Sequence, residues 1–330
     1  MKKIASVIKT ATGEMVISGP LPAHEDLSYF DLGASIHFTA FELGRNLKNY
    51  RKLSLNSLIK EFHAVKIIFE QGKYLQMYAG TGKMEMYLNR YEDCLPCIIY
   101  IDKRNLVHHD PYINASYISG IDYPEQKDLY IATQAPLPYT ISHFWHMVLN
   151  QQVGSIFTLC QPLEIKKVTT TKGRCEEYWP AQGKKATFND LTIENKQESN
   201  LKSRQEREIE ITYQDKKWTT KQIHFTNWPD KSIPSEKDDL EQLVNELQNE
   251  EKKKKKIIIH CSAGVGRTGT LLALTQLKTL IDYQKNNGLD LGISVFSIVR
   301  RLREQRVFSV QTIEQYEMIN DFVEKWVNRK

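Results

Sequence analysis

Two residues in the last third of the chain, Cys261 and Arg267, have the types and the spacing of a thiol nucleophile and the cation that binds its target. They lie in the segment IIIHCSAGVGRTGT, residues 257–270. Backbone N–H groups of a glycine-rich loop attract anions, and a guanidinium can hold two oxygens in a planar fork. The same groups stabilise a thiolate, so the pKa of Cys261 should fall below the free value of about 8.5. The segment therefore predicts a nucleophile that faces a bound oxyanion.

The chemistry that fits this segment is attack of sulfur on phosphorus, and we call residues 261–267 the phosphate loop. Arg267 and the loop amides would hold the remaining phosphate oxygens, whose charge shifts in the transition state. The alternative is a small buried cysteine in a strand-to-helix turn, where free cysteines are common. We prefer the nucleophile because His260, Thr268 and several glycines lie in the same segment as Cys261.

The segment HCSAGVGRTG resembles the active-site loop of the tyrosine-specific, cysteine-dependent protein tyrosine phosphatases. This resemblance implies that Cys261 forms a phosphocysteine and that Arg267 binds phosphate. It implies that His260 helps to set the pKa of the thiolate and that the hydroxyl of Thr268 assists the second step. It also implies a non-receptor enzyme with a single catalytic domain and with neither a metal nor an organic cofactor. The phosphate would further contact the loop itself, namely Ser262, Ala263, Gly264, Val265 and Gly266.

A second segment, residues 228–230, reads Trp-Pro-Asp. Expelling a tyrosine oxygen as a phenolate is costly, so a carboxylic acid over the leaving group should accelerate the reaction about 10²- to 10⁴-fold. Alone, the segment would suit an ordinary turn with a solvated carboxylate. It resembles the mobile acid loop of the same family, which implies that Asp230 protonates the leaving oxygen and then acts as the base for the hydrolytic water.

Two further segments complete the candidate site. In residues 89–93, an exposed Tyr91 can stack on an aromatic ligand and Asp93 can accept peptide N–H groups. This segment resembles the family's phosphotyrosine-recognition loop, in which Tyr91 sets the depth of the pocket and Asp93 anchors the substrate main chain. By the same resemblance, Gln311 positions the attacking water and Gln315 assists it.

The elements that must hold these residues follow from the pattern of apolar side chains. Three consecutive isoleucines before His260 suit a buried strand, and the apolar residues of 270–281 suit a helix after the phosphate loop. The sequence therefore predicts an α/β fold, a twisted mixed β-sheet flanked by α-helices, with the Cys-x5-Arg loop between a central strand and a helix. Further strands are predicted at 112–118, 130–136 and 155–160, and further helices at 55–69, 141–148, 235–251, 295–302 and 313–326.

The chain is predicted to divide at about residue 54. Residues 1–54 would form an extension of unknown role that packs on the main domain, with a hairpin around Thr12-Gly13. The catalytic domain would span residues 55–330. Within it, the charged stretch that ends at Lys221 predicts antiparallel strands with a loop around residues 194–205.

Composition narrows the class of protein. Lys and Arg number 45 against 40 Asp and Glu, which gives a net charge of +5 in 330 residues. This mild charge gives no sign of nucleic-acid binding and is compatible with phosphotyrosine-containing proteins or peptides as partners. The lysine run 252–256 suits a solvated helix end. No stretch approaches about 18 consecutive apolar residues, so no transmembrane segment is predicted, and we expect a monomer.

The cysteines are five, at irregular spacing. This pattern predicts no disulfide framework and favours a reducing compartment, which a catalytic thiolate also requires, so a cytoplasmic location is expected. The apolar run 155–160 predicts that Cys160 lies in the core. The pair Cys94-x-x-Cys97 lacks the βαβ context of a redox motif.

Two other functions compete with a protein tyrosine phosphatase. One is a phosphotyrosine-binding module that has lost catalysis, but Cys261, Arg267 and Asp230 are all present. The other is a dual-specificity phosphatase that also accepts phosphoserine, phosphothreonine or lipid phosphates, which requires a shallower pocket. Tyr91 implies a depth that only phosphotyrosine spans, so the sequence favours the tyrosine-specific enzyme.

Overall fold

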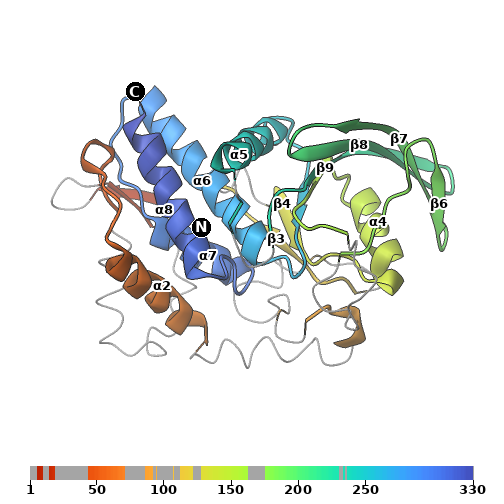
Figure 1. Ribbon diagram of the computed structural model, residues 1–330, viewed down its shortest axis with the longest axis horizontal. Coiled ribbons are helices and arrows are strands. Elements are labelled where there is room, and N and C mark those ends of the chain that lie inside the picture. Colours follow the sequence, from red (N-terminus) through yellow and green to blue (C-terminus); the bar gives the residue numbers. More distant parts are fainter. Residues whose placement is uncertain are drawn as a thin grey trace.

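The structure is built on one twisted, mixed β-sheet with helices on both faces (Figure 1). This computed structural model describes residues 6–9, 15–18, 44–70, 86–91, 94, 107, 112–121, 128–162, 175–229, 233–234 and 236–329. Within these residues the sheet has eight strands in the order β3-β4-β10-β5-β9-β8-β7-β6. The predicted α/β fold, with a central strand before the phosphate loop, is confirmed.

The elements have the following bounds. The strands of the sheet are β3 (Ala115–Ile118), β4 (Tyr130–Thr133), β5 (Ser155–Thr158), β6 (Lys185–Phe188), β7 (Leu191–Asn200), β8 (Arg204–Tyr213), β9 (Lys216–Phe225) and β10 (Ile257–His260). The helices are α2 (Leu55–Glu70), α4 (Ile141–Asn150), α5 (Lys237–Glu251), α6 (Gly266–Asn286), α7 (Val295–Gln305) and α8 (Ile313–Asn328). The predicted N-terminal hairpin is an antiparallel pair of its own, β1 (Ser6–Lys9) with β2 (Met15–Ser18).

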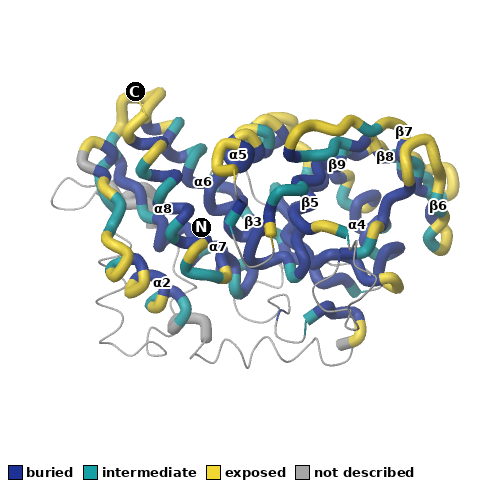
Figure 2. The backbone as a smooth tube through the Cα atoms, viewed as in Figure 1, coloured by how far each residue is buried: buried dark blue, intermediate teal, exposed yellow. Residues whose placement is uncertain are grey.

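The isoleucine run forms β10, the strand that leads into the phosphate loop. It pairs in parallel with β4 on one side and with β5 on the other. Ile257 and Ile259 face the larger core, beneath α2 and α5 to α8, whereas Ile258 faces the smaller core beneath α4. A strand between parallel neighbours is covered on both faces, so the three isoleucines are all buried and the usual alternation of apolar and polar residues is lost. Figure 2 shows the resulting buried centre of the sheet.

Helix α6 is the central helix of the larger layer. It packs against α5, α7 and α8, and α2 contacts α7 and α8. The first half of α6 is buried on every side, which explains why, apart from Arg267 and Gln276, it consists of small and aliphatic residues and has no solvent-facing polar stripe. In the described residues no helix, α6 included, is both long and apolar enough to cross a membrane.

One row of residues crosses the sheet at the carboxyl ends of its parallel strands. His260 pairs with Thr133 of β4 and with Thr158 of β5, and Thr158 pairs in turn with His224 of β9. Open α/β sheets bind ligands at this edge, where loops leave the strands. The row therefore brings the loop after β10 close to the loop after β9.

The end of the N-terminal segment packs on the last helices. Tyr50 is fully buried in the larger core. The side chain of Lys52 forms an ion pair with Glu317 of α8, with 2.9 Å between Nζ and Oε1. These contacts join residues 44–54 to the main sheet-and-helix body, while the domain boundary and the role of the extension stay predictions.

The cysteines do not all stay free, although the sequence predicted no disulfide framework. Cys160 and Cys175 form a disulfide, with 6.3 Å between their Cα atoms. Cys160 is buried as predicted, but an isolated parallel bridge between Pro162 and Cys175 brings the second cysteine beside it. Cysteine spacing in the sequence carries no information about such a tertiary approach.

The antiparallel strands predicted before Lys221 are confirmed, but the loop predicted around residues 194–205 is much shorter than that range. β7 runs to Asn200 and β8 begins at Arg204, so only three residues separate two long antiparallel strands. The charges that suggested a loop instead pair across the strands, as between Arg207 Nε and Glu198 Oε2 at 2.9 Å.

Loss of the disulfide should lower the stability of the fold. The two cysteines are 15 positions apart, and a cross-link closing a loop of about 15 residues contributes roughly 3 kcal/mol, chiefly by restricting the unfolded chain. We therefore expect the Cys160→Ser/Cys175→Ser variant to have a free energy of unfolding about 3 kcal/mol below that of the oxidised protein, measured by urea denaturation. Reduced wild-type protein is the matched control, and equal stabilities of oxidised and reduced protein would contradict the prediction.

Candidate active site

The phosphate loop connects β10 to α6, and one glycine in the loop and another in the first turn of α6 allow close packing here. Gly264 has φ of +71°, a left-handed conformation, and a Cβ there would overlap the backbone carbonyl of Thr133. A Cβ on Gly269 would lie 2.6 Å from the backbone nitrogen of Val310, so this glycine lets the segment before α8 approach α6. The loop thus packs closely against β4, and the first turn of α6 packs against the chain that enters α8.

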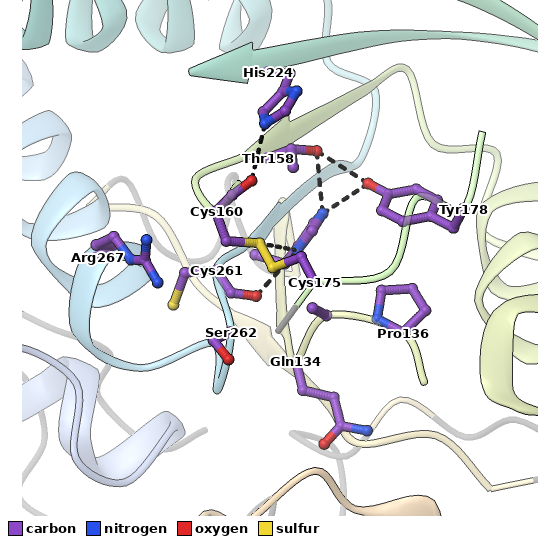
Figure 3. The surroundings of a disulfide bond; sticks show 12 residues. Gln134, Pro136, Thr158, Cys160, Cys175, Tyr178, His224, Cys261, Ser262 and Arg267 are labelled. Carbon is purple, nitrogen blue, oxygen red and sulfur yellow. Dashed lines mark hydrogen bonds between the residues drawn. A yellow bond between two sulfur atoms is a disulfide. The ribbon is translucent and has the colours of Figure 1, made fainter. Parts of the chain in front are cut away.

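The nucleophile candidate Cys261 is 3% exposed and lies near Arg267 (Figure 3). Burial alone would raise the pKa of its thiol. The charge of Arg267, the hydroxyl of Thr268 and the backbone N–H groups of Thr268 and Gly264 outweigh burial, and the pKa of Cys261 falls below its ordinary value. The structure therefore brings together Cys261, Arg267 and Thr268 as a stabilised thiolate site.

His260 is held as a neutral ring rather than as a cation. Burial lowers the pKa of His260 to about 3. Its Nδ1 lies 3.2 Å from the carbonyl oxygen of Cys261, which can only accept, so the network assigns the proton to Nδ1. Its Nε2 then accepts from the hydroxyl of Tyr178 at 2.7 Å and lies 3.1 Å from Thr158 Oγ1. His260 therefore acts on Cys261 by orienting its backbone, and the positive charge beside the sulfur comes from arginine.

Sequence reasoning did not identify Arg306, yet this residue shapes the phosphate loop. Its buried guanidinium donates to the carbonyl oxygens of Gly264 (2.7 Å) and Ala263 (3.0 Å). It also donates to Asn114 Oδ1 (2.9 Å) and Ser116 Oγ (3.1 Å) beside β3. Burial lowers the pKa of Arg306 to about 10, so the group stays charged at neutral pH. With two loop carbonyls turned toward Arg306, loop amides are left to face the opposite side, which is the arrangement that an oxyanion site requires.

Arg267 also links the phosphate loop to the predicted acid loop. Its Nη1 donates to the carbonyl oxygen of Trp228 at 3.0 Å, and Trp228 is itself buried in the larger core. Asp230, two positions after Trp228, lies outside the described residues. The structure therefore brings the start of the Trp-Pro-Asp segment to Arg267, the predicted phosphate-binding residue.

The predicted recognition segment also reaches the phosphate loop. The hydroxyl of Tyr91 lies 2.9 Å from Ser262 Oγ. The preceding Arg90 is buried and donates to the carbonyl oxygens of Ala135 (3.2 Å) and Pro136 (2.7 Å), which anchors the segment on the chain after β4. Tyr91 is thus placed at the edge of the site, whereas Asp93 lies outside the described residues.

The two glutamines lie against the start of α6 in different ways. A Cβ on Gly266 would lie 3.1 Å from Gln311 Oε1 and 3.3 Å from Gln315 Nε2. Gln311 is exposed, whereas Gln315 is fully buried and caps α8 together with Thr312. Oε1 of Gln315 accepts from the backbone nitrogen of Gln311 at 2.9 Å. Gln315 therefore holds the backbone of Gln311, and its predicted places as an assisting and substrate-binding residue stay predictions.

The contacts of Arg306 lead to a prediction about anion binding. Leaving a buried carbonyl without its donor costs about 1–3 kcal/mol, which the loop would relieve by turning carbonyls into the site. We expect Arg306→Met to weaken the binding of inorganic phosphate about 10-fold or more, measured by calorimetry. Arg51→Met, which removes an exposed arginine, is the control, and unchanged phosphate affinity in a folded Arg306→Met protein would contradict the prediction.

The environment of Cys261 leads to a prediction about thiol reactivity. Thiolates, not thiols, react with iodoacetamide, so the midpoint of alkylation against pH should lie below the free-cysteine value of about 8.5. Arg267→Met removes the attracting charge and should move the midpoint upward, and Thr268→Val should move it upward by removing the hydroxyl that lowers the pKa of Cys261. Mass spectrometry of the peptide that contains Cys261 separates it from the other cysteines. A midpoint that neither substitution moves would contradict this account of the pKa.

Comparison with known proteins identifies the family. The family model described as protein-tyrosine phosphatase matches residues 85–325. Human receptor-type tyrosine-protein phosphatase alpha is 34% identical over 292 residues, which cover 85% of this chain and 34% of the relative. Human receptor-type tyrosine-protein phosphatase eta is 34% identical over 273 residues, which cover 80% of this chain and 19% of the relative. The chain thus spans about a third or less of the length of these curated relatives.

Solved structures agree in fold. The crystal structure of the catalytic domain of human protein tyrosine phosphatase non-receptor type 18 superposes with a TM-score of 0.70 and 30% identity, covering 83% of this chain and 97% of that chain. A structure of PTPN18 in complex with HER2 phosphopeptides has a TM-score of 0.70 and 28% identity, covering 83% of this chain and 93% of that one. Family model, sequence identity and fold converge, and the chain belongs to the protein-tyrosine phosphatase family.

Proposed function

We propose that this chain hydrolyses phosphotyrosine in proteins through a phosphocysteine on Cys261. The observation that carries the proposal is the lowered pKa of this buried thiol, beside Arg267 and in a loop whose carbonyls bind Arg306. Such a site stabilises an anion twice, first the thiolate and then the phosphate oxygens as their charge shifts. Nucleophile and electrostatic catalyst are therefore parts of one loop.

The reaction divides into two displacements at phosphorus. In the first, the thiolate of Cys261 attacks, the bond from phosphorus to the tyrosine oxygen breaks, and Asp230 gives its proton to that oxygen. In the second, water positioned by Gln311 attacks the phosphocysteine, and the Asp230 carboxylate takes the water's proton. The P–S bond then breaks, which returns the thiolate and releases inorganic phosphate.

The substrate class follows from the recognition segment and the relatives. The hydroxyl of Tyr91 contacts Ser262 of the phosphate loop, so its ring lies where it can stack on an aromatic ring that enters the site. PTPN18, which resembles this chain in fold, is described in complex with HER2 phosphopeptides. These points support phosphotyrosine-containing proteins or peptides as substrates, with Asp93 as the anchor for the peptide main chain.

Location, assembly and cofactors complete the proposal. We expect a cytoplasmic monomer that needs neither a metal nor an organic cofactor, because the proposed mechanism uses only side chains and backbone amides. The Cys160–Cys175 disulfide means that two of the five cysteines no longer argue for a reducing compartment. The expectation of such a compartment rests on the thiolate of Cys261 alone.

Turnover of phosphopeptides tests the function directly. Wild-type protein should hydrolyse a phosphotyrosine peptide in the presence of a chelator and leave matched phosphoserine and phosphothreonine peptides intact. Cys261→Ser should abolish turnover, because a hydroxyl is not ionised by this site. Asp230→Ala should reduce turnover about 10²- to 10⁴-fold and remove the fall in rate at alkaline pH, where a general acid loses its proton.

The same assay distinguishes the competing functions. Binding of the phosphotyrosine peptide without any turnover by wild type would identify a phosphotyrosine-binding module. Comparable turnover of all three peptides would identify a dual-specificity phosphatase. Activity that the chelator abolishes would contradict the proposed mechanism.

A further inference from the structure

The Cys160–Cys175 disulfide is not used by the proposed mechanism, yet it lies between the two loops that carry it. β5 lies in the sheet between β10, which leads into the phosphate loop, and β9, which leads into the acid loop. Cys160 follows β5 by two residues, so it leaves the sheet at the edge where both loops begin. Each cysteine is 3% exposed. Figure 3 shows the bond with Cys261 and Tyr178 on either side of it in that view.

On the side of the phosphate loop, the disulfide borders the histidine that precedes the nucleophile. Sγ of Cys160 lies 3.9 Å from Nδ1 of His260, the nitrogen that donates to the carbonyl oxygen of Cys261. Cys175 lies three residues before Tyr178, whose hydroxyl donates to the other ring nitrogen of His260 at 2.7 Å. The disulfide therefore joins the segment that borders Nδ1 of the His260 ring to the segment whose Tyr178 bonds Nε2.

On the side of the acid loop, Cys160 and its neighbour hold the chain that leaves β9. The backbone carbonyl of Cys160 accepts a hydrogen bond from Nε2 of His224, at 2.9 Å (Figure 3). Burial lowers the pKa of His224 to about 4, so this ring is neutral and its bond to Cys160 holds at neutral pH. The side chain of Gln161 donates to the carbonyl oxygen of Thr226, two residues before Trp228. Cys160 and Gln161 thus contact His260, which precedes the phosphate loop, and the chain that leads into the acid loop.

We propose that Cys160 and Cys175 are positioning residues for phosphoryl transfer, whose disulfide keeps the acid loop aligned with the phosphate loop. Reduction of the bond lets the chain at Cys160 and Gln161 move, and with it the two contacts to the chain before the acid loop, from the Cys160 carbonyl to His224 and from the Gln161 side chain to Thr226. The inference rests on the proposed function, because its effect is on protonation of the leaving group by Asp230. A displacement of about 1 Å can cost on the order of 10²-fold in rate, so a partial loosening is measurable.

The redox step needs a dithiol reductant, for which dithiothreitol is the probe. One of its thiolates attacks a sulfur of the disulfide, the S–S bond breaks, and a mixed disulfide forms. The second thiolate of the reductant then displaces the protein sulfur. Two electrons and two protons pass to the cysteine pair, and the reductant leaves as its own disulfide. Since both cysteines are buried, the step is slow in the folded protein, and oxidised and reduced forms can be assayed separately.

The test measures kcat/KM for aryl phosphates whose leaving groups range from phenol to 4-nitrophenol. A poor leaving group needs the acid and a good one needs it little, so the dependence on leaving group reports the placement of Asp230. The three forms compared are oxidised wild type, wild type reduced by dithiothreitol, and Cys160→Ser/Cys175→Ser. Each is normalised to the burst of 4-nitrophenol, which counts the enzyme with a reactive Cys261. Near-ultraviolet circular dichroism at the assay temperature verifies that each form is folded.

Both forms without the disulfide should lose about 10-fold in kcat/KM for phenyl phosphate and less than about 3-fold for 4-nitrophenyl phosphate. Reduced wild type should match the double variant, and dithiothreitol should leave the double variant unchanged. This last result separates the effect of the disulfide from effects of the reductant on other cysteines.

A uniform loss across the series, or no loss, would overturn the inference, because a merely structural cross-link changes the amount of folded enzyme and not its dependence on the leaving group. Asp230→Ala is the internal reference. If it steepens the dependence while loss of the disulfide does not, the positioning role fails and the proposed function stands. If Asp230→Ala leaves the series unchanged, the acid assignment fails, and the positioning role fails with it.

Discussion

Stabilising a negative charge on a buried sulfur is the constraint on which the rest of the structure depends. Cys261 is almost fully shielded from water, so its thiolate must be balanced by fixed protein groups. Arg267 supplies a full charge, and Thr268 and the loop amides supply dipoles. Arg306 contributes from behind by binding the loop carbonyls, which would otherwise repel the anion. A site organised in this way for a thiolate is already organised for the oxygens of a phosphate, and this is why one short loop can serve both.

The sheet provides the rigidity that this arrangement requires. β10 is covered on both faces and is paired on both edges, so the loop that follows it starts from a fixed point. At the same edge, His260 and His224 are neutral because burial penalises their charged forms. Each ring can therefore act as a donor and an acceptor of hydrogen bonds without competing with Arg267 for control of the thiolate. Arginine therefore supplies the positive charge, and the neutral histidines supply hydrogen bonds that hold the backbone.

The disulfide adds a covalent link at the one strand that separates the two catalytic loops. Near it, Tyr178 bonds the His260 ring that precedes Cys261, and His224 of β9 bonds the carbonyl of Cys160. A cross-link placed at the periphery would stabilise the fold without touching the chemistry. Placed between β10 and β9, it connects the stability of the fold to the geometry of the reaction.

The sequence by itself determined the parts of the site that are local. The strand, the glycine-rich turn and the helix around Cys261 follow from adjacent residues, because apolar runs and glycines act through their immediate neighbours. The place of Arg306 did not follow, since an arginine after a helix looks the same in the sequence whether or not it supports a distant loop. The Cys160–Cys175 bond was likewise decided by a tertiary approach beside β5. The tautomer of His260 depends on Tyr178 and on the carbonyl of Cys261. Contacts between segments that are far apart in the chain are set by the packing of the sheet and its helices, and only the tertiary structure decides them.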